Sequence, residues 1–338
     1  MRRIPIALLA AIVTVFAFAA PAFAQTGTGN MTLIVPATVT AGVPFTVSGY
    51  NPQTDITFIP ALISSDDTVD GVNAGGRPPV YLIEYMNQNY SSGDYSSKVT
   101  LMKTGTVTLY TTISMLGDRL MAFPNTPDPT WISSPVTVNV QPGRYNFSDL
   151  AGYENEEYAI YYEAFQGLLP GMTATKFAPG VDVTRAQFAT VLQHMLKLKV
   201  TSHTTFADVF PKTPGYSAIE AAAPFMNSYT VNNKIDFRPN QRIAREDAWA
   251  AVVKAQKALG IITAGEDNAI LDNDDVSFYH LSVPSSERLA VGYAIGSGYV
   301  TGSRYTSSNL MYPTSPMPRA ILAQFLLNVQ NTVASSKH

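Results

Sequence analysis

Three arginines in the second half of the chain have the residue type and the spacing to bind an anionic group. Arg185, Arg245 and Arg319 each lie six residues after a proline, where the pattern predicts the start of a helix. A planar guanidinium can bind a carboxylate through two parallel hydrogen bonds, and the positive end of a helix dipole adds to this attraction. The alternative is that each arginine pairs with a neighbouring carboxylate of the chain and only ties parts of the fold together.

Four polar residues could support these arginines. Thr184 and Gln187 have the spacing of a capping box, which would fix the first turn of the helix that Arg185 opens. Asp149 and Asp208 could either cap the segments that follow them or orient an arginine. Capping is the better-founded interpretation, because aspartate is favoured at turns and helix starts.

The arginines belong to three repeated blocks, which we assign to residues 142–200, 201–262 and 263–332. In each block a phenylalanine stands 12 residues before an alanine, and only the loop between the later positions varies in length. Apolar residues at helical spacing predict a helix, a loop and a second helix in every block. Pro224 should kink or end the first helix of the second block. The paired positions are Phe147 and Ala159, Phe206 and Ala218, and Phe278 and Ala290.

This pattern resembles the S-layer homology repeat, which begins Phe-x-Asp and has an Ala-Ile helix, Phe-x-Pro and then Thr-Arg-Ala-Glu at a helix start. Residues 183–187, Val-Thr-Arg-Ala-Gln, come close to the last motif, and residues 243–247 and 317–321 match it more loosely. The resemblance implies an all-α pseudo-threefold domain that binds a pyruvylated, anionic cell-wall polysaccharide through the three arginines. His280 replaces the aspartate in the third block, so any shared acidic role is in doubt there.

The preceding residues, 25–141, favour an all-β domain. Apolar residues alternate in seven or eight short runs, which predicts an immunoglobulin-like sandwich, with residues 103–105 as a hairpin turn. Tyr85, Tyr90 and Tyr95 could form a platform for a sugar, although strand packing is the commoner role of such tyrosines. The predicted fold class is therefore multidomain: this sandwich followed by the all-α domain.

The amino terminus predicts export. Arg2 and Arg3 precede the apolar run Ile4–Ala20, and the small-residue motif Ala22–Ala24 follows it, which is typical of a cleaved signal peptide over residues 1–24. The alternative is an uncleaved membrane anchor. With cleavage we expect no membrane span, a secreted protein and a location at the cell surface or wall.

Composition excludes several classes of protein. Charged residues make up 14% of the chain, and the formal net charge of −3 falls by two to −5 when the two signal-peptide arginines are removed, which argues against nucleic-acid binding. The absence of cysteine excludes disulfides and thiolate metal sites. We predict no cofactor. Calcium binding by Asp66, Asp67 and Asp70, or by residues 271–275, is the less favoured alternative to solvated loops.

Three functions are compatible with these patterns. The favoured one is a noncatalytic surface protein anchored to wall polysaccharide by the repeats. The alternatives are an S-layer or surface-fibre subunit that self-associates through the β domain, and a wall-anchored enzyme. The sequence shows no nucleophile–base signature and no phosphate-binding loop, so we predict that the protein is not an enzyme.

Overall fold

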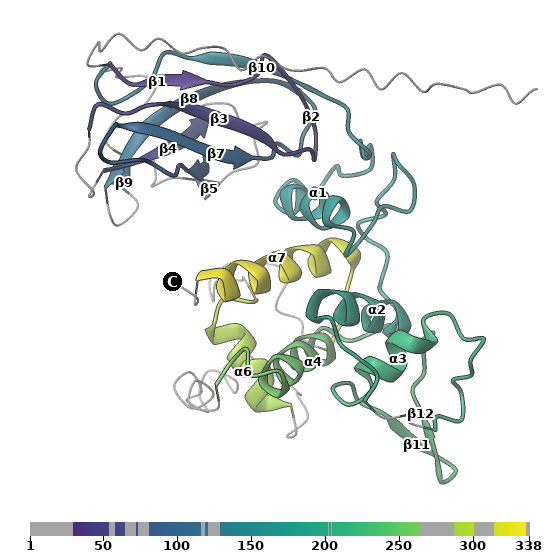
Figure 1. Ribbon diagram of the computed structural model, residues 1–338. Coiled ribbons are helices and arrows are strands. Elements are labelled where there is room, and N and C mark those ends of the chain that lie inside the picture. Colours follow the sequence, from purple (N-terminus) through teal and green to yellow (C-terminus); the bar gives the residue numbers. More distant parts are fainter. Residues whose placement is uncertain are drawn as a thin grey trace, which may run out of the picture.

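The computed structural model describes residues 30–53, 58–64, 72–73, 81–115, 119–120, 129–201, 203, 205–263, 287–300 and 314–335. Strands dominate before residue 142, and helices dominate after it (Figure 1). The predicted signal peptide, both acidic segments considered for calcium, and His280 lie outside the described residues.

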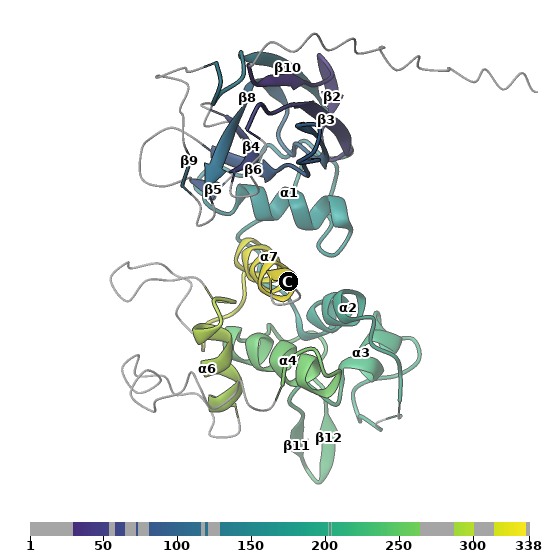
Figure 2. The ribbon, with the colours of Figure 1, turned by 60° about the vertical axis from the view of Figure 1, so that its left-hand side comes forward.

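The strands before residue 142 form two sheets. The smaller sheet has the order β1-β3-β7, and the larger has the order β2-β10-β8-β4-β6-β5, with β9 paired to β8. The larger sheet curls into a partial barrel (Figure 2). Val47, Leu109 and Val138 are fully buried in the core of this part. The strands are β1 (Thr32–Ile34), β2 (Thr38–Thr40), β3 (Phe45–Tyr50), β4 (Phe58–Ser64), β5 (Val72–Asn73), β6 (Tyr81–Tyr85), β7 (Asp94–Val99), β8 (Gly105–Met115), β9 (Arg119–Leu120) and β10 (Val136–Gln141).

The predicted hairpin turn at residues 103–105 is wrong. β7 pairs with β3 in the smaller sheet, whereas β8 pairs with β4 and β10 in the larger one, so these residues connect two sheets. Alternating apolar residues alone predict a strand over residues 98–102, whereas β7 begins at Asp94, with Tyr95, Ser97 and Val99 buried and the residues between them exposed. Because a serine occupies one buried position, hydrophobicity alone places the start of this strand too late.

The chain after residue 142 contains the helices. Three of the second-half helices begin at the repeated arginines, as predicted, and α3 ends before Pro224, also as predicted. No helix among the described residues combines the length and apolar character that crossing a membrane requires. The helices are α1 (Glu157–Gln166), α2 (Arg185–Leu196), α3 (Tyr216–Ala222), α4 (Arg245–Ala258), α6 (Arg288–Gly296) and α7 (Arg319–Ser335).

The predicted fold class, an immunoglobulin-like sandwich followed by an all-α pseudo-threefold domain, is wrong. The second part is mixed, because β11 (Tyr229–Val231) and β12 (Lys234–Asp236) form an antiparallel hairpin between α3 and α4. Asn232 and Asn233 connect these strands with φ angles of 51° and 61°, which a two-residue hairpin turn requires. In the first part, the larger sheet is a curled partial barrel. The chain is thus a mixed α and β protein.

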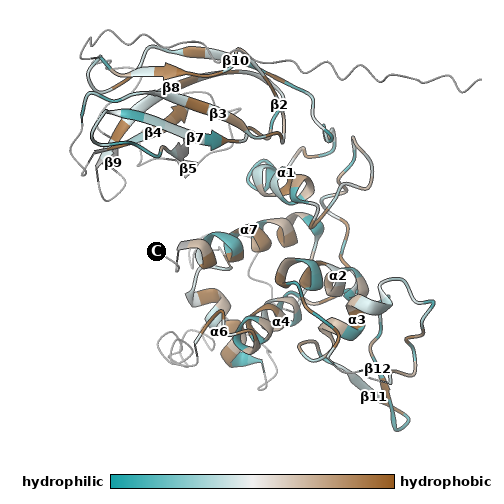
Figure 3. Cartoon of the chain, viewed as in Figure 1, coloured by the Kyte–Doolittle hydropathy of each residue, from teal (hydrophilic) through white to brown (hydrophobic). Residues whose placement is uncertain are grey.

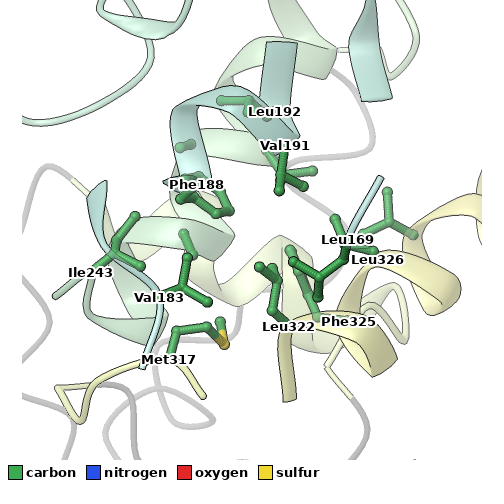
Figure 4. Close-up of a cluster of buried hydrophobic side chains, with 14 of the residues drawn as sticks. Leu169, Val183, Phe188, Val191, Leu192, Ile243, Met317, Leu322, Phe325 and Leu326 are labelled. Carbon is green, nitrogen blue, oxygen red and sulfur yellow. The ribbon is translucent and has the colours of Figure 1, made fainter. Parts of the chain in front are cut away.

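One hydrophobic cluster runs through the second part. α2, α4 and α7 each carry hydrophobic and hydrophilic residues along their length (Figure 3), and the buried hydrophobic residues of all three belong to the same cluster. Val183, Ile243 and Met317 lie side by side just before these helices (Figure 4). The cluster therefore joins the three blocks into a single packed body.

Helix α1 connects the strands to the helices. It lies between the two sheets and α7 in both ribbon views (Figures 1 and 2). Phe165 of α1 packs against the core of the β part, and a Cβ added at Gly42 would overlap its ring. Lys103, between β7 and β8, forms an ion pair at 2.9 Å with Glu157, the first residue of α1. Since these contacts join the two parts, cutting the chain near residue 142 would expose the ring of Phe165.

Candidate functional site at the seams between the blocks

Three short segments meet where the blocks contact one another. The amide of Val183 donates to the carbonyl of Met317 at 2.8 Å, that of Met317 donates to Ile243 at 3.0 Å, and that of Ile243 donates to Val183 at 3.0 Å. The three bonds close a ring in which every block donates to one block and accepts from the other. Each repeated arginine follows two residues after a member of this ring.

The ring fixes the starts of the three arginine-bearing helices. The main-chain N–H of Arg185 donates to Gln241, that of Arg245 to Ser315, and that of Arg319 to Val181, over 2.8–3.1 Å. The first N–H groups of a helix lack partners within the helix. Here a loop of another block supplies one of those partners. The main-chain N–H of each arginine is therefore not available to bind an anion.

The side chain of Arg185 is engaged with the second block. Its Nε donates to the carbonyl of Phe237 at 2.8 Å, its Nη2 donates to the carbonyl of Asn227, and its Nη1 lies 3.5 Å from a carboxylate oxygen of Asp247. The guanidinium carbon also lies 4.9 Å from the centre of the Phe237 ring. Burial lowers the pKa of Arg185, although the nearby Tyr229 and Asp247 oppose this shift. We call the contact between this arginine and the Phe237 segment the 1–2 seam.

Arg319 makes the same kind of contact with the first block. Its Nε donates to the carbonyl of Phe177 at 2.9 Å, and its Nη2 donates to the carbonyl of Pro170 at 2.6 Å. Its guanidinium carbon lies 4.5 Å from the centre of the Phe177 ring. Burial lowers the pKa of Arg319, and Asp149 opposes this shift. We call this contact the 3–1 seam.

Arg245 occupies the equivalent place between the second and third blocks. Its Nε donates to the carbonyl of Pro316 at 3.3 Å. The segment of the third block that would correspond to Phe177 and Phe237, around residue 311, lies outside the described residues. The exposed fractions of the three arginines are 0% for Arg185, 5% for Arg245 and 7% for Arg319.

Asp149 and Asp208 cap the segments that the arginines contact. The two oxygens of Asp149 accept from the amides of Phe177 and Ala178 at 3.0 and 2.9 Å, and those of Asp208 accept from Phe237 and Arg238 at 2.8 and 2.6 Å. Burial by itself would raise the pKa of Asp149, but the two N–H groups together with the charge of Lys176 outweigh it, and the pKa lies below its ordinary value. Asp149 and Asp208 therefore act as caps, as predicted, but not of the segments that follow them: each binds a Phe-x-Pro segment that begins 28 or 29 residues further along the chain.

The predicted capping box is also confirmed. The amide of Gln187 donates to the hydroxyl of Thr184 at 3.3 Å, and the side-chain oxygen of Gln187 accepts from the amide of Thr184 at 2.9 Å. Ala244 takes the same position before α4 without a side-chain hydrogen bond. These contacts fix the start of α2 but leave Arg185 directed into the fold.

A group of buried and half-buried polar residues beside the 1–2 seam was not predicted from the sequence. The Nδ2 of Asn227 donates at 2.8 Å both to Asp247 and to Glu287, and Lys254 lies 3.1 Å from Glu287. Burial, with the charges of Asp247 and Glu287, raises the pKa of Glu246 to about 7. Asn227 and Glu287 are not among the positions that recur in the three blocks, so the repeat pattern could not identify them.

A second buried carboxylic acid lies where α1 meets α7. Glu163 is fully buried, and one of its oxygens accepts from the side chain of Gln330 at 2.6 Å. Burial raises its pKa to about 8, and the hydrogen bond from Gln330 opposes this shift. Among the described residues, no group of three or more acidic or histidine side chains could hold a metal ion. The two acidic segments considered for calcium lie outside that part of the chain.

The contacts of Arg185 and Arg319 bring the candidate residues together around the seams. Each arginine, the phenylalanine whose carbonyl it contacts, and the aspartate that caps that phenylalanine form one connected unit in the described residues. These arginines tie the blocks together, as in the alternative interpretation, but mainly through main-chain carbonyls. Of Arg185 and Arg319, only Arg185 forms an ion pair with a described residue, Asp247. Binding of a polysaccharide carboxylate remains a proposal.

Comparison with known proteins supports a relationship to surface-layer proteins. No family model matches the chain. Over 200 residues the chain is 25% identical to the "Surface-layer 125 kDa protein" of Lysinibacillus sphaericus, and the match covers 57% of this chain. The match covers 15% of that protein, so the chain corresponds to a small part of it. This similarity fits a protein of the cell surface.

Proposed function

We propose that this chain is a noncatalytic, exported cell-surface protein that attaches to the wall by binding an anionic, pyruvylated polysaccharide. The binding part is the three-block region, whose sequence resembles S-layer homology repeats. The observation that carries the proposal is the equivalent arginine at the start of a helix in every block. The similarity to a surface-layer protein supports the location.

The arginines would contribute to binding in two ways. Arg185 is fully buried, so its role would be to hold the 1–2 seam in the shape that the polymer recognises. Arg245 and Arg319 retain a small exposed fraction, and a carboxylate of the polymer would bind at the exposed part of these side chains. Several such contacts along one polymer chain would add through effective concentration, although each of them is weak.

The test uses residues 25–338, because α1 packs against the β part and a shorter fragment would expose Phe165. The protein is sedimented with purified cell walls before and after chemical removal of the wall polysaccharide. We expect it to sediment only with untreated walls. Equal sedimentation with stripped walls would contradict the proposal.

Conservative variants separate binding from folding. Lysine keeps the charge of arginine but loses the planar fork that binds a carboxylate through two bonds. We expect Arg245→Lys with Arg319→Lys to weaken sedimentation while circular dichroism shows a folded protein. Arg242→Lys is the matched control, because Arg242 is largely exposed and pairs only with Asp182 among the described residues. Unchanged sedimentation of the double variant would show that the polymer does not use these guanidinium groups.

The second candidate function is self-assembly as a surface-layer or fibre subunit. The name of the similar Lysinibacillus sphaericus protein favours it. Light scattering of residues 25–338 without wall material distinguishes the two functions. Large particles would support assembly through the protein itself, and a monomer that sediments with walls would support attachment alone.

A further inference from the structure

A polar opening of about 540 Å³ lies in the β part, far in sequence from the repeated arginines. It is bordered by the outer face of the smaller sheet and by the chain that leaves β6. The volume falls within the range of small-molecule sites in proteins. Its walls are formed by Thr46, Tyr85, Asn87, Ser96, Ser97 and Lys98.

The strand register gathers three of these side chains on one face. Thr46 of β3 stands directly opposite Lys98 of β7, and Ser96 is two residues before Lys98. Directly opposed residues of an antiparallel pair, and alternate residues of one strand, share a face of the sheet. The burial pattern of β7 agrees, because Ser96 and Lys98 are exposed while their neighbours are buried. Two hydroxyl groups and one ammonium group therefore face the same opening.

Tyr85 and Asn87, which also line the opening, are held in place by contacts with other residues. The half-buried ring of Tyr85 packs against a cluster that contains Ala61, Ile63 and Ile132. The amide of Asn87 donates to the hydroxyl of Ser97 at 2.9 Å, and its side-chain nitrogen reaches the same hydroxyl at 3.3 Å. These contacts fix an aromatic ring and a side-chain amide at the same opening as the hydroxyl groups.

This set of groups suits a sugar that carries a carboxylate. Hydroxyl and amide side chains exchange hydrogen bonds with sugar hydroxyls, and an aromatic ring offers an apolar face to the C–H groups of a sugar ring. Lys98 forms no ion pair with any residue that the structure describes. An ammonium group binds a carboxylate more strongly than it binds a neutral hydroxyl. We propose that this opening is a binding site for an acidic saccharide, separate from the seams and independent of the function proposed for them.

A lysine on an edge strand can also serve only to keep other strands from pairing with it, and β7 is at the edge of the smaller sheet. That role needs no ligand and no particular neighbours. The two roles are distinguished by measuring binding, because only the saccharide site predicts that an added ligand depends on Lys98.

The experiment is calorimetric titration of residues 25–338 with tetragalacturonate. Maltotetraose serves as the neutral saccharide and tetra-aspartate as the acidic peptide of equal charge. We expect tetragalacturonate to bind at least tenfold more tightly than either of these. Equal binding of maltotetraose, stronger binding of tetra-aspartate, or no binding of tetragalacturonate at millimolar concentration would overturn the proposal.

Variants assign the binding to the opening. Lys98→Gln should weaken tetragalacturonate binding roughly tenfold, Lys98→Arg should keep it within about threefold, and Thr46→Val should weaken it about threefold. Lys212→Gln is the control, because it removes one charge from another exposed position. All four changes are at exposed positions, and circular dichroism confirms that each variant is folded. If Lys98→Gln and Lys212→Gln bind equally, the saccharide binds elsewhere and the opening is not its site.

Discussion

At the 1–2 and 3–1 seams, equivalent arginines of two blocks bind the same kind of main-chain acceptor, but their surroundings differ. In both, Nε binds the carbonyl of a phenylalanine and Nη2 binds a second carbonyl of the same block. At the 1–2 seam the guanidinium also faces the carboxylate of Asp247. At the 3–1 seam Arg319 forms no ion pair with a described residue. The repeat thus specifies the main-chain contacts and leaves the ionic ones free to differ.

This difference explains why the acceptors are hard to see in the sequence. The second acceptor is the carbonyl of Asn227 at one seam and of Pro170 at the other. Every residue has a main-chain carbonyl, including proline, so the side chain at this position can change without loss of the contact. The phenylalanine and the capping aspartate, in contrast, act through their side chains and appear in the repeat.

The largest effect we predict comes from removing an arginine at a seam. Arg185→Ala would leave two carbonyls and the carboxylate of Asp247 without their buried partner, which should lower the free energy of unfolding by about 3–5 kcal/mol. Arg319→Ala removes two carbonyl contacts and no ion pair, so we expect a smaller loss of about 2–3 kcal/mol. Denaturant unfolding of residues 25–338 measures both values.

Arg242→Ala is the control for these variants. Its side chain is 68% exposed and pairs with Asp182, so the loss should be at most about 1 kcal/mol. Equal losses for Arg185→Ala and Arg319→Ala would show that Asp247 contributes nothing and would remove the energetic difference between the seams.

Much of the site could be predicted from residue spacing because its parts are local. A helix start with its cap involves residues three positions apart, which explains why the capping box at Thr184 and the arginine positions were found. The contacts of Asp149 and Asp208 span 28–30 residues, and spacing gave their capping role without its target. The burial of Arg185 depends on residues of another block, and a single charged residue in a sequence does not show whether it is buried.

The fold class was the weaker prediction for a related reason. Helical periodicity dominates the second half, so a hairpin of two three-residue strands left only the Asn232-Asn233 pair as a signal. The alternation of strands in the first half revealed their number approximately. The assignment of each strand to a sheet depends on pairings between distant residues, which is why β7 and β8 were mistaken for a hairpin.

A second prediction compares the acidic groups near the two seams by changing the pH. Glu163, between α1 and α7, has a pKa of about 8 in the folded chain and about 4.5 when exposed. Between these values unfolding releases a proton, so the free energy of unfolding falls as pH rises. Glu163→Gln cannot ionise and should be more stable than the parent by roughly 4 kcal/mol at pH 8, with little difference near pH 4.5.

The measurement is denaturant unfolding of both proteins at intervals from pH 4.5 to pH 8. Glu246, beside the 1–2 seam, has a pKa raised to about 7, so the parent should lose stability through two groups and the Glu163→Gln variant through one. Parallel stability curves for parent and variant would mean that Glu163 is ionised throughout and that its burial has no energetic effect.

The smallest predicted effect concerns the helix caps that distinguish the first and second blocks. Thr184 and Ala244 have nearly the same backbone angles, with φ and ψ of −80° and 160° against −72° and 152°, so a threonine fits either position without strain. Thr184→Ala should cost about 1 kcal/mol, because it removes the hydroxyl that accepts from Gln187. Ala244→Thr should add only about 0.5 kcal/mol, because Asp247 already binds Asn227 and cannot complete the box. The two variants are measured by denaturant unfolding against the same parent, with Thr184→Ser as the control that keeps the hydroxyl. A gain at Ala244 as large as the loss at Thr184 would show that the hydroxyl alone caps these helices and that the Gln187 half of the box adds nothing.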